Sequence, residues 1–186
     1  MLILGIGNLL MGDEGVGVHA IRALEREPMP PGVFLLDGGT GGFHLLELFD
    51  EHRHLILIDA TLDDGKPGTV RVLHPKFATD FPRSLSAHDI GLRDLVESAT
   101  LLGPLPTIDL ITISIAKIQP MTIEMTPEVR DSLPLVMQTA RQQIRGSCSP
   151  ESMSTMRRAP MRVCSTSRPC GSSRTWPMMA ASFPSG

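Results

Sequence analysis

The strongest constraint on the fold is an alternation of short apolar runs with segments of helical period over the first 145 residues. The predicted strands are residues 2–6, 33–36, 54–58, 69–73 and 108–115. The predicted helices contain Val18, Ile21 and Leu24, residues 43–49, residues 90–99, and a last segment that Pro127 opens after an N-cap at Thr126. This order predicts an α/β three-layer sandwich with a twisted, mostly parallel sheet flanked by helices. A hairpin-like link between residues 54–58 and 69–73 would make the sheet mixed.

The composition changes sharply after residue 145. Residues 146–186 contain five arginines, one acidic residue and all three cysteines, and they show no periodicity that could bury an apolar face. Disorder is the physical expectation for such a segment, and translation in a shifted reading frame fits it equally well. We therefore predict a domain at residues 1–145 followed by a tail at residues 146–186.

Charge and hydropathy exclude several classes of protein. The net charge is −3 and no block of Lys or Arg is present, so no nucleic-acid partner is expected. No stretch approaches the roughly 20 apolar residues that span a bilayer, and the apolar start has no basic lead-in. The expected location is the cytoplasm, with no membrane contact. Residues 1–145 also lack cysteine and a G-x-S-x-G motif, which argues against a covalent nucleophile.

Three potential metal ligands lie where α/β proteins place their sites, at or just beyond the carboxyl ends of strands. Glu14 precedes the first helix, Asp59 is expected as an exposed carboxylate that ends the third strand, and His88 opens a later helix. Two carboxylates and one imidazole suit a borderline divalent cation and leave coordination positions open. Each residue also has an ordinary structural interpretation, as a helix N-terminal acid, a loop cap or a surface histidine.

A fourth acidic residue, Asp37, lies in a glycine-rich segment, residues 37–42, directly after the second strand. Four glycines in six residues predict either positive φ angles or close approach by a partner chain. The segment is therefore a peptide-accommodating loop in which Asp37 polarises or orients the peptide, or simply a tight strand-to-helix turn.

Four motifs occur in order: Gly5-Ile6-Gly7-Asn8 through Gly12-Asp13-Glu14-Gly15-Val16-Gly17-Val18, Asp37-Gly38-Gly39-Thr40, Ile58-Asp59-Ala60, and Ser86-Ala87-His88-Asp89-Ile90-Gly91-Leu92. Together they closely resemble the hydrogenase maturation proteases, and the resemblance spans residues 1 to about 144. It implies an endopeptidase that removes the C-terminal extension of the nickel-loaded large-subunit precursor of a nickel-iron hydrogenase.

The resemblance also assigns roles to residues. It implies that Glu14, Asp59 and His88 contact the metal, and that Asp37 and Asp59 are the catalytic candidates. The expected metal is nickel carried by the precursor, with no nucleotide cofactor, and the precursor is the expected partner. Ligand type alone does not distinguish nickel from zinc, manganese or iron.

Two alternative functions are open at this point. The first is a dinucleotide-binding oxidoreductase, because Gly5-Ile6-Gly7 follows a strand; Leu10 occupies the position of its third glycine, however. The second is a chaperone-like module that binds nickel or the precursor without cleaving it, since the ligands would be the same.

Overall fold

A computed structural model describes residues 1–81 and 92–147. Its single sheet contains β1 (Leu2–Ile6), β2 (Phe34–Gly39), β3 (His54–Thr61), β4 (Val70–Leu73) and β5 (Thr107–Ser114). The helices are α1 (Val16–Leu24), α2 (Leu46–Glu51), α3 (Leu92–Leu102) and α4 (Pro127–Ser147), with 3-10 turns η1 (Gly12–Gly15), η2 (Gly42–Leu45) and η3 (Ala78–Asp80). The strands lie in the order β2-β1-β3-β5-β4, with β4 antiparallel to its neighbour. The predicted α/β fold with a mostly parallel mixed sheet is confirmed.

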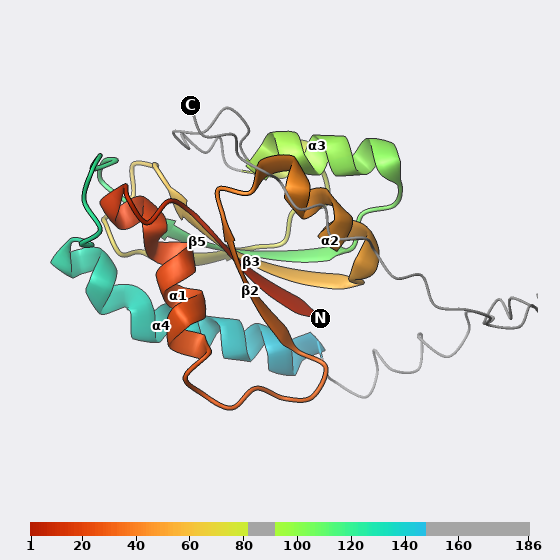
Figure 1. Cartoon of the computed structure of the whole chain (residues 1–186), viewed down its shortest axis with the longest axis horizontal. Helices are drawn as coiled ribbons and strands as arrows, with labels where there is room; N and C mark the ends of the chain where they lie inside the picture. Colours follow the sequence, from red (N-terminus) through yellow and green to blue (C-terminus); the bar gives the residue numbers. More distant parts are fainter. Residues whose placement is uncertain (82–91, 148–186) are drawn as a thin grey trace, which may run out of the picture.

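The sheet is the middle of three layers. Helices α1 and α4 cover one face and helices α2 and α3 cover the other (Figure 1). Alternation along β3 supplies both cores, because Ile56 and Ile58 pack toward α1 and α4 while Leu55 and Leu57 pack toward α2 and α3. This two-sided burial explains why the central strands have continuous apolar sequences.

The predicted hairpin between the third and fourth strands is wrong. Strand β4 pairs with β5, so β5 lies between β3 and β4. The reason is burial: β5 is buried over almost its whole length, whereas β4 is only partly buried and exposes Arg71. A strand that is apolar on both faces belongs in the centre, and a partly polar strand suits the edge.

Strand β3 is also longer than predicted. It continues through Thr61, and Asp59 pairs with Thr112 of β5, so Asp59 lies inside the ladder and not at its end. Its other neighbour, β1, ends at Ile6. The last residues of β3 therefore extend past β1 at the carboxyl edge of the sheet.

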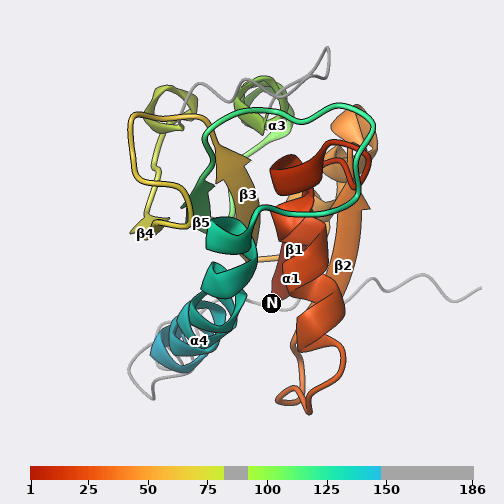
Figure 2. The same ribbon diagram turned by 90° about the vertical axis from the view of Figure 1, so that its left-hand side faces the viewer.

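The segment between β5 and α4, residues 115–126, passes over this carboxyl edge and lies beside the segment that leads from β1 into α1 (Figure 2). Within residues 1–81 and 92–147, no helix has the length and apolar character needed to cross a membrane. The cytoplasmic location and the division at residue 145 stay predictions; helix α4 itself runs to Ser147.

Candidate functional site

Glu14 lies in the turn η1, directly before α1, and is only 4% exposed. Its carboxylate accepts a hydrogen bond from the backbone N–H of Asn8 at 3.0 Å. The turn packs against β3, which brings the carboxylate to the carboxyl edge of the sheet. Glu14 is therefore a buried group held at the strand ends. Its burial is not explained by a favourable charge at a helix N-terminus alone.

Asp59 is 8% exposed, so the expectation of an exposed strand-end carboxylate is wrong. Desolvation by burial, reinforced by the negative charge of Glu14, raises the pKa of Asp59 to about 7, although a hydrogen bond from the Ala60 N–H opposes the shift. The charge of Glu14 thus reaches Asp59. The structure brings these two predicted site residues together, although they are far apart in the sequence.

The pair fits a divalent cation. Two buried carboxylates repel each other, and a cation placed between them would replace that repulsion with attraction. Carboxylate oxygens are ordinary ligands for such ions. Glu14 and Asp59 would supply two of the contacts, from η1 and from β3.

The third predicted ligand, His88, lies outside the described residues, as does its motif up to Leu92, the first residue of α3. Across residues 1–81 and 92–147, no three His, Cys, Asp or Glu side chains gather closely enough to hold a metal ion. The three-residue site therefore stays a prediction, with two of its members placed.

Asp37 is not part of this pair. It lies on β2 opposite Gly5 of β1, and Gly5 in turn lies opposite Ile58 of β3, so the backbones of Asp37 and Ile58 are roughly 10 Å apart. Its half-exposed carboxylate accepts a hydrogen bond from the Gly39 N–H at 3.0 Å and lies 3.4 Å from Arg22. In these contacts Asp37 organises the glycine-rich turn at the same edge of the sheet.

Two glycines allow the turn η1 to lie so close to the sheet. A Cβ at Gly17 would lie 2.3 Å from the carbonyl oxygens of Ile6 and Ile58, and one at Gly7 would lie 2.0 Å from the carbonyl oxygen of Glu14. Both distances are far inside van der Waals contact. These glycines therefore serve packing between β1, η1 and α1, and the sequence signal that suggested a dinucleotide has another cause.

The same contacts argue against that alternative. The Asn8 N–H, which a phosphate-binding loop would offer to a ligand, is bonded to Glu14 instead. Buried acidic side chains beside the loop would also repel a pyrophosphate. The dinucleotide-binding interpretation is therefore unsupported by the site.

Asp13 is a structural residue that the sequence analysis missed. It is fully buried, and its carboxylate accepts hydrogen bonds from the Thr126 N–H at 2.6 Å, the Thr126 hydroxyl at 3.0 Å and the Gln119 amide at 3.0 Å. The Asp13 N–H also donates to Gln119 at 3.0 Å. Asp13 thus ties η1 to the segment before α4, and the predicted N-cap Thr126 is used for this tie.

A second buried acid lies at the opposite, amino edge of the sheet. The Asp109 carboxylate lies 2.7 Å from Nε2 of His54 through one oxygen and 2.7 Å from Nδ1 of His74 through the other. The two histidines satisfy Asp109 and join the starts of β3 and β5 to the end of β4.

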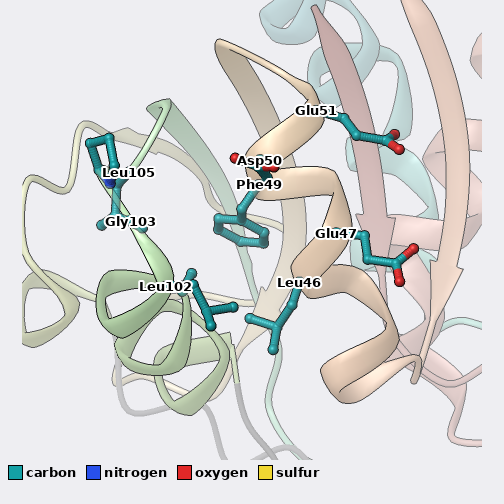
Figure 3. Close-up of a pocket in the computed structure, with 10 residues that line it drawn as sticks. Leu46, Glu47, Phe49, Asp50, Glu51, Leu102, Gly103 and Leu105 are labelled. Carbon is teal, nitrogen blue, oxygen red and sulfur yellow. The ribbon is translucent and has the colours of Figure 1, made fainter.

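A hollow between α2 and α3 lies in the layer behind the sheet. Figure 3 shows Leu46 and Phe49 of α2 facing Leu102 of α3, while Glu47 and Glu51 point away. Apolar side chains form most of this lining, and its three acids, Glu47, Asp50 and Glu51, are all exposed. The hollow therefore contains no buried acidic pair like that of Glu14 and Asp59.

Comparisons with known proteins agree on one family. A model of the hydrogenase maturation proteases matches residues 18–143, which include Asp37 and Asp59. The hydrogenase expression/formation protein HupD of Rhizobium leguminosarum bv. viciae is 34% identical over 151 residues, covering 75% of this chain and 71% of that protein. Among solved structures, the hydrogenase maturating endopeptidase HybD from Escherichia coli is 32% identical with a TM-score of 0.72, over 79% of this chain and 93% of that one. The [NiFe] hydrogenase maturation protease HybD from Thermococcus kodakarensis is 28% identical with a TM-score of 0.63, over 76% and 97%.

Proposed function

The chain belongs to the hydrogenase maturation proteases, a family of peptidases, and on that basis we propose that it removes the C-terminal extension of a nickel-loaded hydrogenase large-subunit precursor. The nickel is part of the substrate in this proposal. Membership in a peptidase family favours cleavage over a binding-only module and over an oxidoreductase.

One observation carries the proposed site: Glu14 and Asp59 are both buried where η1 packs against β3, and burial together with the charge of Glu14 raises the pKa of Asp59 to about 7. A perturbed acid at the carboxyl edge of an α/β sheet is typical of a functional site. Contact with nickel in the precursor would hold both groups in the charged form.

We assign the third nickel contact to His88, on the strength of its sequence motif. Nickel can polarise the scissile carbonyl or activate water, and the contacts made by Glu14 and Asp59 would align the precursor for that step. We assign Asp37 to orienting the extended peptide, because it holds the glycine-rich turn at the same edge of the sheet.

The test uses a purified large-subunit precursor in nickel-loaded and nickel-free forms, with the released C-terminal peptide measured by mass spectrometry. We expect cleavage of the nickel-loaded form only. Asp59→Asn, Glu14→Gln and His88→Ala should each reduce the rate by roughly 100-fold or more, because each removes a group aimed at the cation.

Asp131→Asn is the matched control, since this carboxylate is exposed on α4. It should cleave at the wild-type rate. Equal cleavage of the two precursor forms would refute nickel recognition, and full activity of Asp59→Asn would refute the site.

A further inference from the structure

Two loops at the site form one structural unit. The Thr122 N–H donates to the Leu10 carbonyl at 3.2 Å, and the Gly12 N–H donates to the Thr122 carbonyl at 2.8 Å. Asp13, the next residue after Gly12, adds four hydrogen bonds to Gln119 and Thr126. We call residues 8–13 and 119–126 the rim. Its two halves are more than 100 residues apart in sequence and are held in a fixed relative position.

Large apolar side chains extend from this rim into solvent. Leu10 is 58% exposed, Met121 is 91% exposed and Ile123 is 63% exposed. Single exposed apolar residues are ordinary, but several on one rigid element mark an interaction site. The rim combines a firmly hydrogen-bonded backbone with an apolar outer surface.

The backbone of Met121 is a second, independent sign of function. Its φ is +60°, a left-handed conformation that favours glycine and disfavours a side chain such as that of methionine. Glycine at this position would relieve the strain, yet the chain carries a large apolar side chain there and exposes nearly all of it. Such strain is typically stored where a side chain must be presented to a ligand.

We propose that Leu10, Met121 and Ile123 bind an apolar segment of the precursor beside its scissile bond and so help to determine which precursor is processed. The inference rests on the proposed function. Its basis is the continuity of the rim with the site, because Asp13, the buried anchor of the rim, directly precedes Glu14. A rim already held by hydrogen bonds loses little conformational freedom on binding.

The size of the apolar surface favours the precursor over a second copy of this chain. A stable, specific protein interface buries roughly 1,200 Å² or more, which three side chains cannot supply by themselves. As an addition to the contacts that Glu14 and Asp59 make with the metal of the precursor, three side chains are enough to discriminate between substrates.

The test separates binding from cleavage by using Asp59→Asn enzyme with nickel-loaded precursor. Adding Leu10→Asn, Met121→Asn and Ile123→Thr should raise the Kd about tenfold or more, since apolar contact area is lost. Asn at position 121 tolerates the left-handed backbone and so preserves the rim. In otherwise wild-type enzyme the same three changes should raise KM by a similar factor and leave kcat within twofold.

Leu101→Asn is the matched control, because Leu101 is 88% exposed on α3, away from the rim. It should leave Kd and KM unchanged. An unchanged Kd in the rim variant, an equal rise for Leu101→Asn, or a fall in kcat alone would overturn the inference. So would size-exclusion chromatography showing a wild-type dimer that the rim changes dissociate, because a second copy would then occupy the rim. If the wild type fails to cleave the precursor but the rim changes still weaken binding, the proposed cleavage is refuted and binding of the precursor by the rim is supported.

Discussion

An aspartate is buried at each of the two edges of the sheet, and the residues that surround the two carboxylates differ. At the amino edge, Asp109 lies 2.7 Å from ring nitrogens of His54 and His74. At the carboxyl edge, Asp59 lies within the field of another acid, Glu14, and its pKa rises to about 7 through burial and that charge. One carboxylate lies within hydrogen-bonding distance of two imidazole rings, and the other lies near a second acid.

This difference distinguishes an acid that has hydrogen-bonding partners within the protein from the acid that we propose contacts the metal of the precursor. A buried carboxylate with imidazole partners contributes to stability, because its hydrogen bonds compensate for the loss of water. A buried carboxylate beside a second carboxylate costs stability in the free protein, and the cost is recovered when a cation binds. Burial alone therefore does not single out the candidate site; the chemical nature of the residues around the buried carboxylate does.

Asp59→Asn should give the largest change in the free energy of unfolding. The variant should be more stable than the wild type although it loses activity. An acid whose pKa is raised from 3.8 to about 7 on folding contributes no penalty near pH 4, a growing penalty as the pH rises toward 7, and the full penalty above it. Asp59→Asn removes this penalty. Its free energy of unfolding should exceed that of the wild type by up to about 4 kcal/mol at pH 8 and by little near pH 4.

Urea unfolding of both proteins between pH 4.5 and 8 (roughly the range over which the penalty develops) would measure this difference. Asp131→Asn should follow the wild type throughout. If the free energy of unfolding of Asp59→Asn and of the wild type changed with pH in parallel, burial and the charge of Glu14 would not destabilise ionised Asp59. The contrast between the two edges would then disappear.

Removing the buried acid of the amino edge should lower stability and leave activity unchanged, and the change in stability should be smaller than that for Asp59→Asn. Asp109→Ala removes the partner of His54 and His74, and it should lower the free energy of unfolding by about 1–3 kcal/mol. Cleavage per folded molecule should stay within twofold, as judged by the processing assay at a temperature well below the unfolding midpoint. A loss of cleavage without a loss of stability would make Asp109 a functional residue and reverse the comparison.

Asp37 should show the smallest effect, because it is half-exposed and its Arg22 partner is also exposed. Asp37→Asn should change the free energy of unfolding by less than about 0.5 kcal/mol. Its rate of cleavage should fall about tenfold, the equivalent of one orienting hydrogen bond. A loss as large as that of Asp59→Asn would instead place Asp37 among the groups that contact the reacting atoms.

The fold was largely predictable because its signals are local. Apolar runs identified all five strands, and Pro127 marks the start of α4 as expected. The neighbours of a strand are not a local property, which is why β4 was assigned to β3 although it pairs with β5. The extension of β3 to Thr61 has the same cause, since it follows from pairing with β5 up to Ser114.

The sequence pointed to the candidate acids Glu14 and Asp59 and not to their environment. Glu14 and Asp59 were found because acids near the carboxyl ends of strands stand out in an α/β sequence. The burial of Asp59 depends on η1 packing against β3, and the partners of Asp13 lie 106 and 113 residues away along the chain. Such contacts leave no periodicity or spacing by which a single sequence could reveal them.

The absence of a Cβ at Gly17 has a consequence for the spacing of the two acids. The helix start rests directly on the carbonyl oxygens of Ile6 and Ile58, so the spacing between the two acids is set by backbone against backbone. Any side chain at position 17 would push the start of α1, and with it Glu14, away from the end of β3 that carries Asp59. A substitution there would separate the two acids without changing either of them.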